Sequence, residues 1–302
     1  MPLVDRNFKI QMKAERIAKV IARAGICSRR DAERWIKAGR IVLNGRVLDD
    51  PATLVKSEDK IFIDGELLPR PEKLRVWRYY KPAGLLTTHN DPEGRPNLFD
   101  SLPNNLPRVI SIGRLDLTSE GLLLLTNDGG FARELELPSN SWSRRYRVRI
   151  NGQPDREILA DLINGITIDG VRYKSIQAEL DRQQGSNAWL TVSLIEGKNR
   201  EIRRIMEYFN WQVSRLIRTS YGPFQLGSLK KGEVDEVRGK VLREQMGIQD
   251  RSGFAEKSQK KLYRPAVSRR KLNDNRKKFK ANKLSKSKLQ IMKKINTPEN
   301  KY

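Results

Sequence analysis

The sequence predicts an α+β protein with two domains and a basic C-terminal tail. Short helix and strand patterns occur together near the N-terminus, and strand patterns then follow one another with few helices between them. From about residue 251 the apolar periodicity disappears. Consecutive strands favour a largely antiparallel mixed sheet over alternating βαβ units. We expect domains at residues 13–72 and 73–240 and a tail at residues 251–302.

The first domain has the pattern of a small α+β module. Apolar residues spaced i, i+3, i+4, i+7 from Ile17 predict a helix that ends near Gly25. Ser28 is the expected N-cap of a second helix. Asn44-Gly45 lies between two apolar runs, which is a strong hairpin pattern because both residues tolerate positive φ. A short, proline-containing linker at residues 69–73 then leads to the second domain.

The second domain is rich in strand patterns. The predicted strands are residues 75–80, 108–111, 122–126, 145–150, 175–180, 188–195 and 213–219. The predicted helices are residues 155–162 and 200–209. Four consecutive leucines in the third strand indicate burial on both faces, and Asn127-Asp128-Gly129-Gly130 is expected to form a turn after it.

The net charge of +24 indicates a polyanionic partner, most simply a nucleic acid. Residues 251–302 hold 18 of the 60 Lys and Arg residues but only 3 of the 36 Asp and Glu residues. We expect this tail to be disordered in isolation and to add non-specific RNA affinity; the alternative is a solubility tail.

Rare residue types exclude several kinds of site. Cys27 is the only cysteine, so an internal disulfide and a cysteine-rich zinc site are excluded. His89 is the only histidine and lies in a polar stretch, which is typical of a loop residue rather than a catalyst. We therefore expect no metal. No apolar run is long enough to span a bilayer and no N-terminal signal pattern is present, so we expect a cytoplasmic protein.

Basic side chains cluster on the two N-terminal helices. They share two helix faces and the segment between the helices: Arg16, Lys19, Arg23, Ser28, Arg29, Arg30, Arg34 and Lys37. Two short helices followed by a Val-Leu-Asn-Gly-Arg strand resemble the S4 RNA-binding domain. The resemblance implies that these residues contact RNA, whereas either basic stripe alone would be read as a solvated helix face.

The most informative segment is Gly113-Arg114-Leu115-Asp116, which continues through Ser119 and Gly121 into the four leucines. This pattern closely resembles the catalytic segment of the RsuA/RluB-type pseudouridine synthases, in which the Asp is catalytic. Tyr80-Lys81-Pro82-Ala83-Gly84 is similar to the family's N-terminal Lys-Pro-x-Gly motif. For an isolated Arg-x-Asp, a surface pair would be the favoured interpretation.

The resemblance assigns roles to further residues. Tyr146 in Arg144-Arg145-Tyr146-Arg147-Val148 would stack on the target uracil, and Arg203 in the helix after Glu196-Gly197-Lys198-Asn199 would keep Asp116 ionised. Arg114 would contact the RNA backbone. Alone, such a Tyr is usually structural, and such an Arg usually faces solvent or pairs with a residue such as Glu207.

The implied activity is isomerisation of uridine to pseudouridine, a reaction that needs no redox change, no group donor and therefore no cofactor. The motifs are closest to the branch that modifies large-subunit (23S) ribosomal RNA, as free RNA or in a precursor particle. The alternatives are the small-subunit (16S) branch and a non-catalytic RNA-binding assembly factor. A monomer is expected, because no heptad or exposed apolar helix face is evident.

Overall fold

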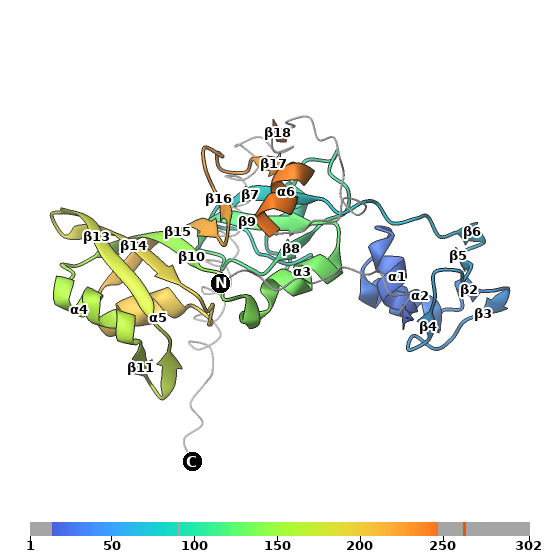
Figure 1. Cartoon of the computed structure of the whole chain (residues 1–302), viewed down its shortest axis with the longest axis horizontal. Helices are drawn as coiled ribbons and strands as arrows, with labels where there is room; N and C mark the ends of the chain where they lie inside the picture. The colour runs from blue at the N-terminus through green and yellow to red at the C-terminus, as the bar shows by residue number, and fades with distance from the viewer. Residues whose placement is uncertain (1–13, 90, 247–261, 264–302) are drawn as a thin grey trace, which may run out of the picture.

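The computed structural model describes residues 14–89, 91–246 and 262–263. It confirms the α+β class: a small N-terminal unit with two helices is followed by a larger unit built on a mixed sheet (Figure 1). The predicted tail at residues 251–302 lies outside the described residues, apart from the short strand β18 (Leu262–Tyr263), which pairs with the main sheet. Within the described ranges, no helix has the length and apolar character needed to cross a membrane.

The N-terminal unit contains the predicted helices and hairpin. Helices α1 (Ile17–Arg23) and α2 (Arg29–Lys37) pack around Ile17, Ile21 and Ile36, which are fully buried. The strands are β1 (Glu15–Arg16), β2 (Ile41–Leu43), β3 (Arg46–Val47), β4 (Leu54–Val55), β5 (Ile61–Ile63) and β6 (Glu66–Leu67). Asn44-Gly45 and Asp64-Gly65 both have positive φ, as expected of the tight turns that join β2 to β3 and β5 to β6.

The second unit is organised on one large sheet. Its strands are β7 (Val76–Lys81), β8 (Ile110–Ile112), β9 (Glu120–Thr126), β10 (Arg144–Asn151), β13 (Ile176–Gln184), β14 (Asn187–Leu194), β15 (Gln212–Tyr221), β16 (Phe224–Gln225) and β17 (Val234–Glu236). The order is β13-β14-β10-β15-β9-β7-β17-β18, with β16 beside β15 and β8 beside β9. Only the β9–β15 pair is parallel among the described strands. The sheet is therefore largely antiparallel, as predicted.

Strand β9 is buried at every position, as the four leucines predicted. The prediction of a turn over residues 127–130 is wrong, because helix α3 (Gly129–Glu136) begins within this segment. The Asp128 side chain accepts hydrogen bonds from the backbone N–H groups of Gly130 and Phe131, at 2.7 and 2.8 Å, and so caps the helix. The local glycines therefore do not end the ordered structure, because capping and burial of Phe131 outweigh their low helix propensity.

Two apolar cores lie on opposite faces of the sheet. One contains Leu123, Leu125 and Val148 and is covered by α4 (Arg156–Asp161), α5 (Glu201–Tyr208) and η3 (Leu162–Asn164). The other contains Leu122 and Leu124 and is covered by α3 and α6 (Gly239–Met246). The remaining elements are η1 (Phe99–Ser101), η2 (Pro138–Asn140), β11 (Ile166–Ile168) and β12 (Val171–Tyr173). Helices α4 and α5 were predicted; α3, α6 and the β11–β12 hairpin were not.

Candidate active site

A cavity of about 410 Å³ opens where the loop before β9 meets β10, β15 and the start of α5. Asp116 and Arg114 come from the loop, Tyr146 from β10 and Arg218 from β15. Segments more than 100 residues apart in the sequence therefore contribute to one site. The predicted residues Asp116, Tyr146 and Arg114 are brought together here.

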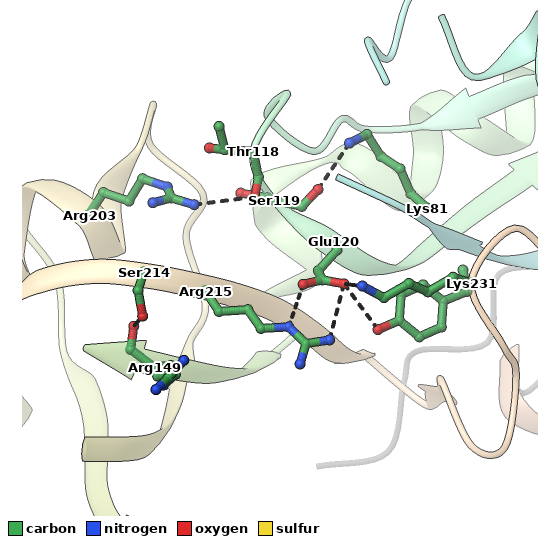
Figure 2. A network of polar contacts seen from close by, with 10 residues as sticks. Lys81, Thr118, Ser119, Glu120, Arg149, Arg203, Ser214, Arg215 and Lys231 are labelled. Atoms are coloured by element: carbon green, nitrogen blue, oxygen red, sulfur yellow. Dashed lines mark hydrogen bonds and ion pairs between the residues drawn. The ribbon is translucent and has the colours of Figure 1, made fainter. Parts of the chain in front are cut away.

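The loop that carries Asp116 is held by its backbone. The Lys81 ammonium is fully buried and donates a hydrogen bond to the Asp116 carbonyl oxygen at 3.1 Å. It also donates to the Ser119 carbonyl oxygen at 3.0 Å (Figure 2). The Gly84 N–H donates to the Leu117 carbonyl at 2.7 Å, and the Thr87 hydroxyl donates to the Leu115 carbonyl at 2.9 Å. Lys81, Gly84 and Thr87 thus hold the loop through its backbone carbonyl groups.

Burial changes the chemistry of Lys81. Desolvation lowers its pKa to about 8, although the negative charges of Asp116 and Glu120 act in the opposite direction. The three acceptors of its ammonium are backbone carbonyls, including that of Pro82 at 3.3 Å. Lys81 therefore fixes the backbone of the loop, and among the described residues no hydrogen bond or ion pair is formed with the Asp116 carboxylate.

Tyr146 and Arg218 lie opposite each other on neighbouring strands. They are paired in the β10–β15 register, so both side chains project from the same face of the sheet, and both line the cavity. Arg218 is only 4% exposed. Its Nε donates to the Leu122 carbonyl at 2.7 Å, while Nη2 is buried and has no hydrogen-bond partner among the described residues. Arg218 thus lines the cavity, and its guanidinium stands 5.2 Å from the centroid of the Tyr221 ring.

The sequence analysis did not identify Arg218 as a residue of the site. A usable signal was the two-residue strand period, which puts Arg218 on the same face as the buried Leu216. The pairing of that face with Tyr146 on β10 is a long-range feature that local spacing does not reveal.

Arg203 occupies the flank of α5 and is 7% exposed. Its guanidinium donates to the Val213 carbonyl at 3.2 Å. It also donates to the Thr118 carbonyl at 3.5 Å (Figure 2). The expected ion pair with Asp116 is not formed in this structure, and Arg203 is not part of the cavity wall. The Arg203 side chain contacts the backbone of the loop that carries Asp116, and its predicted electrostatic role stays a prediction.

Comparisons with known proteins show the family to which the chain belongs. Residues 75–208 match the model of the RNA pseudouridylate synthase family, and residues 15–61 match the S4 domain. An RNA pseudouridine synthase of Rickettsia felis is 50% identical over 228 residues, which are 76% of this chain and 99% of the relative. The chain belongs to the RNA pseudouridine synthase family.

A second relative and a solved structure extend the comparison. Ribosomal large subunit pseudouridine synthase B of Pseudomonas aeruginosa is 41% identical over 245 residues, covering 78% of this chain and 63% of the relative. A crystal structure of a pseudouridylate synthase superposes with a TM-score of 0.55 at 24% identity, covering 76% of this chain and 99% of that one. The superposition shows that the enzyme has the same fold.

The enzyme's S4 domain exposes part of the predicted basic set. Arg16 is exposed but belongs to β1, so it does not share a helix face with Lys19 and Arg23 as expected. Lys19 and Arg23 both form ion pairs with Glu15. Glu15, Lys19 and Arg23 therefore form one cluster of mixed charge rather than a purely basic stripe.

The second predicted stripe, on α2, is also modified by local contacts. The Ser28 side chain caps α2 in a capping box with Asp31, and Arg34 pairs with the same carboxylate. Arg29, Arg30 and Lys37 are exposed without such a partner among the described residues. Those three cations are the ones most available to a phosphate.

A buried acid closes the far side of the enzyme's cavity. Glu201 begins α5, is 4% exposed, and accepts a hydrogen bond from the Lys198 N–H at 2.9 Å. Burial raises the pKa of Glu201 to about 7, and the negative charge of Glu196 adds to the shift. The loop between these two acids lines the cavity, and the Glu201 carboxylate accepts its hydrogen bond from the backbone of this loop.

Proposed function

We propose that this enzyme isomerises a uridine of large-subunit (23S) ribosomal RNA, with Asp116 as the catalytic carboxylate. The observation that carries the proposal is the cavity in which Asp116 lies with Tyr146 and Arg218. An aromatic ring, a carboxylate and a cation converge there from three separate elements. The synthase B relative supplies the choice of ribosomal subunit.

The reaction breaks the N1–C1′ glycosidic bond, turns the uracil and joins it again through C5. Asp116 acts either as nucleophile at C1′ or as base at C2′, and both roles need an ionised carboxylate. Arg218 supplies positive charge from the cavity wall. Arg203 supports the loop through the Thr118 carbonyl. In general, a buried arginine favours the ionised form of a carboxyl group that lies close to it.

The target base must leave its stack before it reaches Asp116. Tyr146 offers a ring at the cavity wall on which the extruded uracil can stack, which offsets part of the unstacking cost. Arg114 is exposed at the rim and is placed to contact the distorted phosphate backbone. Residues 13–72 are proposed to dock the RNA and residues 73–240 to perform the chemistry, in a cytoplasmic monomer.

A pseudouridine map of all ribosomal RNA tests the proposal. It would compare cells that carry the intact gene, a deletion, the Asp116→Asn variant and a control Asp169→Asn variant. Asp169 is exposed in the β11–β12 turn at φ 49°, where Asn is equally tolerated. We expect one large-subunit site to be lost in the deletion and in Asp116→Asn only.

Other results of the same map would contradict the proposal. A lost small-subunit site would keep the chemistry and refute the proposed target. No lost site, together with defective ribosome assembly in the deletion alone, would favour the RNA-binding assembly factor. Retained modification in Asp116→Asn would refute the catalytic assignment, for which turnover should fall on the order of 10³-fold or more.

A further inference from the structure

One half of the main sheet has a face that no described helix covers. On β10, the side chains alternate strictly: Tyr146, Val148 and Ile150 are buried, whereas Arg145, Arg147 and Arg149 are exposed. Helices α4 and α5 lie along the buried side of this half of the sheet (Figure 1). Among the described elements, α3 and α6 cover the opposite face only further along the sheet, over β9.

The neighbouring strands enlarge this arginine row. Arg149 is paired with Trp189 on β14 and with Arg215 on β15, so the three side chains share one face. Arg182 on β13 is the next partner of Trp189. We call Arg145, Arg147, Arg149, Arg182, Arg215 and Trp189 the arginine face.

An aromatic ring lies among these cations. The Arg147 guanidinium stands 4.8 Å from the centroid of the half-buried Trp189 ring. A guanidinium stacked on an aromatic ring keeps its edge donors free for an acceptor that approaches from solvent. The Arg147 side chain is 53% exposed, so such an acceptor can reach it.

Nearby acids neutralise only part of the charge. Asp181 lies 3.8 Å from Arg147, and Glu179 is exposed on the same strand as Asp181. The buried Glu120 carboxylate forms ion pairs with Arg215 at 2.5 Å and with Lys231 at 2.7 Å (Figure 2). Arg145 and Arg149 form no ion pair with a described residue. The arginine face therefore retains a surplus of positive charge.

This surface is separate from the active site. Tyr146 and Arg218 project from the opposite face of the same strands, where the cavity lies. None of the residues of the arginine face lines the cavity that contains Asp116.

We propose that the arginine face binds the phosphate backbone of a second segment of the RNA whose target uridine enters the cavity. Exposed arginines at every second strand position recur every ~6.7 Å, a spacing that suits successive phosphates along a nucleotide chain. Planar guanidinium groups bind phosphate oxygens through paired donors. The inference rests on the proposed function for the identity of the RNA, but not for the binding itself.

The test compares three triple variants of the full chain. Arg145→Gln, Arg147→Gln and Arg149→Gln together remove the central row. The charge-matched control is Arg156→Gln, Lys230→Gln and Lys240→Gln, which are exposed on other elements. A third variant, Arg145→Lys, Arg147→Lys and Arg149→Lys, keeps the charge but not the planar donors.

Two RNA probes separate binding on this face from binding in the cavity: a full-length large-subunit transcript and a short stem–loop with the mapped uridine. For the long transcript at about 150 mM salt, we expect the Gln variant to raise Kd roughly 10-fold and to reduce the salt slope by about 2. The Lys variant should be intermediate. Turnover of the stem–loop should equal that of the parent enzyme.

A Kd and salt slope equal to those of the charge-matched control would overturn the proposal and leave an acidic protein as the ligand of this face. Unchanged melting temperatures would confirm that the variants fold. Failure of this proposal can be told apart from failure of the proposed function. Asp116→Asn tests the chemistry and should leave the Kd of the long transcript unchanged, whereas the Gln variant tests the face and should leave the chemistry unchanged.

Discussion

Tyr146 and Arg218 are cross-strand neighbours on β10 and β15, and both face the cavity that contains Asp116. The parallel pairing of β15 with β9 places Arg218 beside Gly121, at the foot of the Asp116 loop. One strand thus connects the aromatic residue, the cation and the carboxylate. We predict from this arrangement that Arg218 supplies positive charge to the site, beside the role that the sequence predicts for Arg203.

Replacing Arg218 and Arg203 separately distinguishes these two assignments. We expect Arg218→Gln to lower the rate of the chemical step on the order of 10²-fold, because a buried cation is removed from the wall of the cavity that contains Asp116. Arg203→Gln should cost only about 10-fold, because it removes contacts to backbone carbonyls. Single-turnover rates with saturating RNA measure both effects. A larger loss for Arg203→Gln would restore the prediction made from the sequence.

The loop that carries Asp116 could be predicted from the sequence because the residues that define it are contiguous. Asp116, Ser119 and the leucines of β9 are contiguous, so one motif specifies both the loop and the strand that supports it. The arginine that lines the cavity could not be identified in this way. Arg203 and Arg218 both lie beside buried apolar residues, and only the register between β10 and β15 shows which one faces the cavity.

Helix α3 illustrates a second limit. Gly129 and Gly130 predict a turn from local propensity, whereas the structure starts a helix there. The side chains that stabilise it, Phe131 and Leu135, are buried against strands that are close only in the folded state. Tertiary packing outweighs the local signal at this position.

Gly121 is required where β9 meets β15. Its φ is +105°, and a Cβ atom there would stand 2.3 Å from the Arg218 carbonyl oxygen. We expect Gly121→Ala to lower the free energy of unfolding by about 3 kcal/mol or more, because two backbones must separate. The matched control is Gly45→Ala, at φ +83° with no atom within 4 Å, which should cost about 1 kcal/mol. Urea unfolding measures both; equal losses would show that the close approach is unimportant.

Removal of residues 251–302 tests the role assigned to the basic tail. The truncated enzyme should retain turnover, since all cavity residues precede position 251. Its RNA affinity should depend less steeply on salt, because fewer counterions are released on binding. Binding titrations between about 50 and 200 mM salt give the slope. A slope equal to that of the full chain would show that the tail does not contact RNA.

Glu201 gives the stability of the enzyme a specific pH dependence. Its folded-state pKa of about 7 lies above the ordinary value of 4.5, so the unfolded chain ionises first as the pH rises. The free energy of unfolding should therefore fall between about pH 4.5 and 7 and stay lower above that window. The underlying cause is burial of the carboxyl group beside Glu196.

Glu201→Gln should remove this dependence. An amide keeps an acceptor for the Lys198 N–H and resembles the protonated acid. The variant should match the parent near pH 4 and exceed its free energy of unfolding by on the order of 2 kcal/mol at pH 8. Glu179→Gln, on an exposed strand position, is the control that should leave the slope unchanged. Parallel unfolding curves for Glu201→Gln and the parent across this range would show that the Glu201 carboxyl does not control the loop beside the cavity.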